Sequence, residues 1–275
     1  MDVLIIVLVR VVALSGERIF LHFLGEDESG LVTTTVAFGG AAVLLWALAC
    51  ASDQAGLTLR ALLPSIVYAG AFALYTAALS AGAVSTVSPW SNLSVLFLFV
   101  IAPDYGWMAW LGLAVMGIGT GMLTTGTKTE VAPIWLMIGA DVLVVVARVL
   151  DSGHPPQSAL MYAANLYGWV TVWIAGLTLA LGQGRGVMRL LQRRPQWALS
   201  AALTNAAAYL SLILLMPHLP LWVIESLGSV AALIATLLGS FWLLEAPGWR
   251  KIMASWLMST GAVLLLLGHW TVGGG

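Results

Sequence analysis

Three charged residues, Arg10, Glu17 and Arg18, lie in a stretch that is otherwise apolar, VLVRVVALSGERIFLHF at 7–23. On a helix, Arg10 and Glu17 would lie two turns apart, about 10 Å, on roughly one face. Charges inside a membrane cost about 2.5–3.5 kcal/mol each and normally face protein or a hydrated cavity. We therefore expect Arg10 and Glu17 to contact a polar solute or each a partner on another helix. Arg18 is expected to extend toward the lipid headgroups.

Two further carboxylates lie within apolar runs. Asp141 is near the centre of GADVLVVVARVL, and Glu225 is early in a later run. We expect both on the wall of one cavity, with an interfacial position as the alternative for Glu225. Arg148, two turns beyond Asp141, is expected at the membrane interface.

Amides and aromatic rings complete the set of candidate binding residues. Asn92 and Asn205 lie near the middles of their runs, and each amide can both donate and accept hydrogen bonds. They could hold a polar substrate or join two helices. Pro89 should break the helix around Asn92, and broken helices often mark binding sites in transporters. The rings expected to form aromatic walls are those of Tyr75, Trp90, Tyr209 and Trp222.

Motifs for catalysis or metal binding are missing from the sequence. His22, His154, His218 and His269 all fall at the ends of apolar runs, and neither HExxH nor G-x-S-x-G occurs. Cys50 is the single cysteine, so there is no disulfide framework. We expect no metal, no cofactor and no enzymatic activity. An intramembrane enzyme that acts on a lipid or another membrane substrate is the rival class.

The elements that position these residues follow from the composition. The chain has 275 residues, of which 60% are hydrophobic and 8% charged, against about 25% charged in a soluble domain. It is therefore expected to be an all-α integral membrane protein, and a net charge of -1 gives no sign of nucleic-acid binding. With about 20 residues needed for each span, ten membrane helices are predicted. They cover about 3–23, 31–51, 59–81, 84–102, 107–125, 131–150, 157–182, 196–216, 219–243 and 249–269.

The two halves of the sequence match each other weakly. The stretch 106–126 can be laid on 248–268 without a gap, and VRVVALSG at 9–16 on ARVLDSG at 147–153 with a small gap. The first match pairs Gly106, Trp107, Met116, Gly119 and Gly126 with Gly248, Trp249, Met258, Gly261 and Gly268. We predict two repeats, 1–126 and 127–275, that form one transport unit. Because five helices is an odd number, the second repeat should have inverted topology. Helices 3–23 and 131–150 are then equivalent and should meet near the repeat axis, so Arg10 is expected to pair with Asp141.

This 5+5 layout resembles the drug/metabolite transporter superfamily, in particular its EamA-type members. The most similar stretch is 226–267, with small residues followed by Glu245 and Gly248 at the turn and a glycine-bearing last helix. The first half has the weaker counterpart SPWSNLSVLFLFVIAPDYGW, with Pro89 and Asp104. The resemblance implies a secondary transporter with a central cavity between the halves.

The charges of both signs favour a small polar, zwitterionic or charged metabolite as the substrate, moved by alternating access. A coupling proton or another ion is an open alternative, as is a lipophilic drug as substrate. The expected location is the plasma (inner) membrane of a prokaryote, with the lipid bilayer as partner. Gly117 and Gly121 form a GxxxG step that could be an internal contact or the face of a homodimer.

The lysines and arginines of the connections predict the orientation. Arg185, Arg189, Arg193 and Arg194 lie in one connection, Arg250 and Lys251 in another and Lys128 in a third, and with ten helices all three share one side. The opposite side has little beyond Arg60. The positive-inside rule then places both termini outside the cytoplasm, whereas the family resemblance implies both termini inside.

Overall fold

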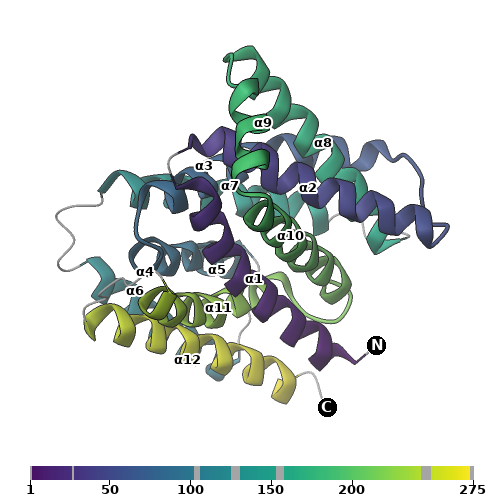
Figure 1. Cartoon of the computed structure of the whole chain (residues 1–275). Helices are drawn as coiled ribbons and strands as arrows, with labels where there is room; N and C mark the ends of the chain where they lie inside the picture. Colours follow the sequence, from purple (N-terminus) through teal and green to yellow (C-terminus); the bar gives the residue numbers. More distant parts are fainter. Residues whose placement is uncertain are drawn as a thin grey trace.

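The computed structural model describes residues 2–26, 28–101, 106–124, 131–152, 158–242 and 249–272, and every regular element in these ranges is helical (Figure 1). The long helices are α1 (Val3–Gly25), α2 (Gly30–Ala51), α3 (Leu62–Ala81), α6 (Trp107–Thr124), α7 (Val131–Ser152), α8 (Ala159–Ala180), α10 (Pro195–Leu215), α11 (Leu221–Trp242) and α12 (Trp249–Val272). The shorter ones are α4 (Val84–Val87), α5 (Leu93–Ile101), α9 (Gly184–Arg193) and the 3-10 helices η1 (Leu59–Ala61) and η2 (Ser88–Asn92).

In the described ranges, eight helices are long and apolar enough to cross a membrane, so the chain is a multi-pass integral membrane protein by helix length and hydropathy. They cover Gly30–Ala51, Leu59–Ala81, Val84–Ile101, Val131–Ser152, Ala159–Ala180, Pro195–Leu215, Leu221–Gly239 and Trp249–Gly268. The two other predicted spans coincide with α1 and α6. Helix α1 has 23 residues and includes three charges, whereas the apolar part of α6 is shorter, Trp107–Met122.

One predicted break is a helix. The stretch 182–195 was expected to be a connection, but Gly184–Arg193 forms α9, which lies beside α2 and α10 with Leu190 buried and Met188 and Arg189 exposed. Alternation of apolar and basic residues at helical spacing gives this short segment one face that can pack on the bundle. The predicted breaks at 52–56 and 216–220 lie between helices, and the breaks at 102–106, 125–130, 151–156 and 245–251 lie wholly or partly outside the described residues. Several residues discussed above lie outside the described residues, namely Asp104, Gly126, Lys128, His154, Glu245 and Gly248.

Side chains fix several helix starts. Asp2, Ser29 and Ser158 each accept a hydrogen bond from a backbone N–H in the first turn of α1, α2 and α8. Each satisfies one of the N–H groups that have no partner at a helix start. The predicted break at Pro89 takes the form of η2, which separates α4 from α5 within one span. Because proline cannot donate a backbone hydrogen bond, the α-helical pattern is interrupted there.

Helix α1 packs antiparallel to α10. Arg10 contacts Ala208, Gly16 lies against Thr204, and Phe23 stacks on Trp197 with ring centroids 4.6 Å apart. The start of α1 and the end of α10 therefore lie at the same end of the bundle, the end where α12 also finishes in Figure 1. We call this the terminal end. Helix α9 lies at the opposite end (Figure 1).

Helices α6 and α12 cross at glycines. A Cβ at Gly261 would lie 2.5 Å from the carbonyl oxygen of Gly112, and one at Gly119 would lie 2.8 Å from that of Ala254. Only glycine permits this approach of the two backbones. Gly117 faces open space within the described chain, so the predicted GxxxG step is not the α6–α12 contact.

Gly261→Ala is expected to lower the free energy of unfolding by about 1–3 kcal/mol, because the added methyl group must push the two backbones apart. Gly117→Ala is the matched control, since it has room for the methyl group and gains helix propensity of up to about 1 kcal/mol. Thermal unfolding of the purified variants in detergent measures both effects. Equal stability of the two variants would contradict the close crossing.

Candidate functional site

A cavity lies among the helices and is lined by charged, polar and aromatic side chains. The space open to the centre of a water-sized sphere is about 90 Å³. One water molecule needs about 10–15 Å³ on this measure, so the cavity has room for several waters or a small solute. Seven of the ten predicted binding residues line it: Arg10, Glu17, Tyr75, Asp141, Asn205, Tyr209 and Glu225. We call it the central cavity.

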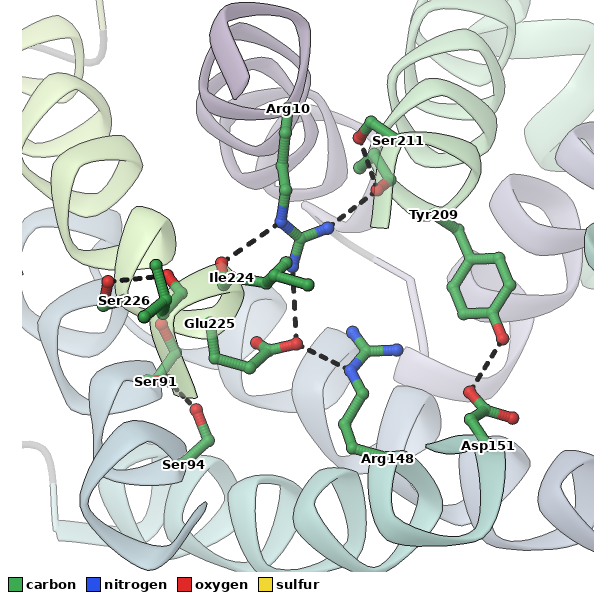
Figure 2. Close-up of polar contacts among 12 residues, drawn as sticks. Arg10, Ser91, Ser94, Arg148, Asp151, Tyr209, Ser211, Ile224, Glu225 and Ser226 are labelled. Atoms are coloured by element: carbon green, nitrogen blue, oxygen red, sulfur yellow. Dashed lines mark hydrogen bonds and ion pairs between the residues drawn. The ribbon is translucent and has the colours of Figure 1, made fainter. Parts of the chain in front are cut away.

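Glu225 is the charged centre of this cavity and binds two arginines (Figure 2). Its Oε1 lies 3.4 Å from Nη2 of Arg10 and 2.6 Å from Nε of Arg148. Arg10 reaches it from α1 and Arg148 from α7, while Glu225 itself is on α11. The carboxylate therefore joins three helices and partly neutralises two buried cations.

Arg10 also binds main-chain carbonyls. Its Nη1 donates to the oxygen of Ala208 at 2.8 Å and its Nε to that of Ile224 at 3.4 Å, on α10 and α11. The side chain is 2% exposed. A guanidinium has five N–H donors, and buried donors must find acceptors. This network fixes Arg10 in place.

The predicted Arg10–Asp141 pair is wrong. Asp141 instead lies close to the backbone N–H groups of Leu93 and Ser94 at the start of α5. Its Oδ2 has no hydrogen-bond partner within the described chain. The physical reason is the break at η2, which leaves helix-start N–H groups inside the span, and such groups favour a negative charge.

Two arginines lie deeper than predicted. Arg148 was expected at the interface but is buried and bound to Glu225. Arg18 was expected to reach the headgroups but is 4% exposed, with Nη1 donating to the Gly228 oxygen at 3.0 Å and Nη2 to Ser91 Oγ at 2.7 Å. Gly228 lies directly beside this guanidinium, since a Cβ there would be in ordinary van der Waals contact, 3.7 Å, with Nη2 of Arg18.

Among the described residues, Glu17 has no hydrogen-bond or ion-pair partner. It is 6% exposed and lines the central cavity. Asn205 accepts a hydrogen bond from the Tyr167 hydroxyl at 2.8 Å, but its Nδ2 is unpaired among the described residues. Both residues line the cavity, so the Glu17 carboxylate and the Asn205 amide are candidate contacts for whatever occupies it.

Three predicted binding residues do not line the central cavity. Trp90 is buried, and its Nε1 has no partner in the described ranges. Asn92 donates to the Pro89 oxygen at 2.9 Å. Trp222 packs edge-on against Phe99 with centroids 5.6 Å apart. All three lie on helices that contribute to the cavity, but their side chains pack between helices and do not line it.

One polar cluster was missed by the sequence reasoning. Asp151 lies in the last turn of α7 and accepts hydrogen bonds from the hydroxyls of Tyr68 at 2.6 Å, Tyr209 at 3.0 Å and Tyr162. The Tyr68 hydroxyl in turn accepts from Nη1 of Arg148. Asp151 begins the sequence DSGHPP, which resembles a turn, so it was assigned to a connection. The tyrosines within apolar runs could have indicated this cluster, since buried hydroxyls need hydrogen-bond partners.

Comparison with known proteins adds information on the fold only. No family model and no curated protein matches the chain. A solved structure described as "Crystal structure of protein" matches with a TM-score of 0.69 at 16% sequence identity, covering 96% of each chain. Such a likeness shows that nearly the whole chain shares this helical fold with a solved structure. The class that follows from fold and hydropathy is a multi-pass membrane protein, here with a charged cavity inside its helices.

Proposed function

We propose that the chain is a secondary transporter of a small polar, zwitterionic or charged metabolite, of the drug/metabolite transporter type. The observation that carries this proposal is the central cavity, in which Glu17 is buried and makes no hydrogen bond or ion pair with the described residues. Charged groups within membrane helices are costly, and they are typically retained along the path of a substrate or ion. A substrate with a hydrogen-bond-donating, positively charged group would supply the partner that Glu17 lacks.

The helix packing supports the inverted repeat that such a transporter uses. If the five spans of each half are laid on one another, α1 corresponds to α7 and α3 to α10. The packing of α1 on α10 then has its equivalent in the packing of α7 on α3, and both contacts are extensive. A pseudo-two-fold axis in the membrane plane produces this kind of exchange.

The α6–α12 crossing adds a second sign of such an axis. Gly119 approaches Ala254 and Met258, and Gly261 approaches Gly112 and Met116. The gap-free match of the two halves, 106–126 on 248–268, places 119 on 261, 112 on 254 and 116 on 258. The contacts are therefore reciprocal between matched positions.

Purified protein tests the proposal in two steps. A panel of amino acids, quaternary amines and nucleobases is first screened for stabilisation against heat, and a ligand at 100 times its Kd should add about 2.7 kcal/mol. Each stabilising compound is then offered in radiolabelled form to proteoliposomes with and without a proton gradient. Stabilising compounds should accumulate. Binding without accumulation, or conversion of a lipid substrate, would contradict a transporter.

The orientation predicts a labelling pattern. Gln192 lies on α9 and Ser52 follows α2 at the terminal end, and both are exposed. With Cys50 replaced by Ala, Gln192→Cys should resist a membrane-impermeant maleimide in intact cells, because the arginines of α9 favour the cytoplasm. Ser52→Cys should be labelled in the same cells. The reverse pattern would place the termini inside, as the family resemblance implies.

A further inference from the structure

A single carboxylate joins four helices at the terminal end of the central cavity. Asp151 on α7 is 2% exposed and accepts from Tyr68 on α3, Tyr162 on α8 and Tyr209 on α10. Hydrogen bonds to a charged acceptor are stronger than those between neutral groups. We call these four residues the Asp151 cluster.

Asp151 and Tyr209 form a wall between two cavities, because each of them lines one of the two. A second cavity, about 550 Å³ by the same measure, is lined by Asp151 and by residues of the α10–α11 connection such as Pro217 and His218. Tyr209 lines the central cavity. Because the Tyr209 hydroxyl donates directly to Asp151 at 3.0 Å, a single hydrogen-bonded layer separates the two spaces there. Figure 2 shows Tyr209 extending to Asp151 next to the Glu225 network.

The second cavity lies at the terminal end of the molecule. Its lining includes the residues that follow Leu215, the last residue of α10, and this helix end lies beside the start of α1. Toward the other end, Ile19, Val84 and Ala235 form a small apolar cluster.

A hydrogen-bonded wall can open reversibly, because water can replace each lost hydroxyl–carboxylate bond once the helices separate.

Arg148 connects the wall to the charges of the central cavity. Its Nη1 donates to the Tyr68 hydroxyl, and its Nε donates to Glu225 at 2.6 Å. The guanidinium also lies over the rings of Tyr68 and Tyr209, 5.2 and 5.7 Å from their centroids. A displacement of Arg148 would therefore disturb two of the three tyrosines that hold Asp151.

We propose that the Asp151 cluster is the gate that closes the central cavity toward the terminal end, and that a ligand competing for Glu225 or Arg148 loosens this gate. This proposal rests on the proposed transport function, because a gate has a role only in a transporter. Its structural basis is the wall between the two cavities. Asp151 acts through the tyrosines and is a positioning residue.

Accessibility of the central cavity tests the gate without any substrate. Ser94 lines the cavity, so Ser94→Cys in the Cys50→Ala background provides a reporter. Membrane-impermeant maleimide is added on the side from which Ser52→Cys is labelled. Tyr68→Phe and Tyr209→Phe should each raise the labelling rate of the reporter roughly tenfold to a hundredfold, the equilibrium effect of losing one hydrogen bond to a charged group. Asp151→Asn should raise it at least as much.

Tyr167→Phe is the matched control, since it removes a buried hydroxyl that binds Asn205 and not Asp151. Its labelling rate should equal that of the parent. Unchanged rates in Tyr68→Phe and Tyr209→Phe, or an equal rise in Tyr167→Phe, would overturn the gate, and these variants suffice if Asp151→Asn does not fold. Faster labelling in a protein that moves no solute would leave the gate standing and refute the transport function. Transport with unchanged labelling would refute the gate alone.

Discussion

Glu225→Gln is expected to lower the free energy of unfolding by about 3–5 kcal/mol, the usual cost of removing one partner from a buried ion pair. The neutral amide keeps the shape of the side chain but removes the carboxylate that pairs with both Arg10 and Arg148, whose side chains are 2% and 9% exposed. Thermal unfolding and unfolding by detergent titration should both report the loss.

Glu26→Gln is the matched control for this prediction. Glu26 pairs with Arg194 at 3.3 Å, but its side chain is 60% exposed. Exposed ion pairs contribute about 0–1 kcal/mol, so this variant should remain close to the parent. A loss at Glu225 no larger than that at Glu26 would contradict a central role of the Glu225 network.

Glu17→Gln is expected to reduce transport by roughly tenfold to a hundredfold while leaving stability nearly unchanged. The first expectation follows because a hydrogen bond or ion pair between Glu17 and a charged substrate group is worth about 1.5–3 kcal/mol. The second follows because Glu17 has no partner within the described chain, so its neutralisation leaves no internal cation unpaired. Initial uptake rates in proteoliposomes and thermal unfolding separate the two effects.

The same substitution thus has opposite signatures at two buried glutamates. Glu225→Gln should damage the fold, whereas Glu17→Gln should damage function in a folded protein. Normal transport by Glu17→Gln would show that this carboxylate is not part of the substrate path, and a large loss of stability would show that it has an internal partner.

The membrane helices could be predicted closely from the sequence, because a span needs a long apolar run and the turns between runs are rich in glycine, proline and charge. Helix α9 was missed since it is short and lies outside any long apolar run. The broken span at Pro89 could also be predicted, because its cause is local. These features depend on neighbouring residues only.

The partners of the charged residues could not be predicted in the same way. Depth along a helix identified Arg10, Glu17 and Asp141 as unusual, but the rotation of each helix about its axis decides which side chains meet. Arg10 and Asp141 were both predicted near the middle of their helices, yet Arg10 pairs with Glu225. Asp151 lies at a helix end, yet Tyr68, Tyr162 and Tyr209 from three other helices enclose it.

The packing of α1 on α10 and of α3 on α7 has a mechanical consequence. Each contact joins a helix of the first half of the sequence to a helix of the second, and the α6–α12 crossing does the same with two backbones in close approach. If the two sequence halves rotated against each other as rigid blocks, all three interfaces would have to shear at once. Close-packed interfaces resist such sliding. If the chain is the transporter we propose, the bodies that move are therefore expected to include helices of both halves, so that the boundary between moving parts does not coincide with the midpoint of the chain.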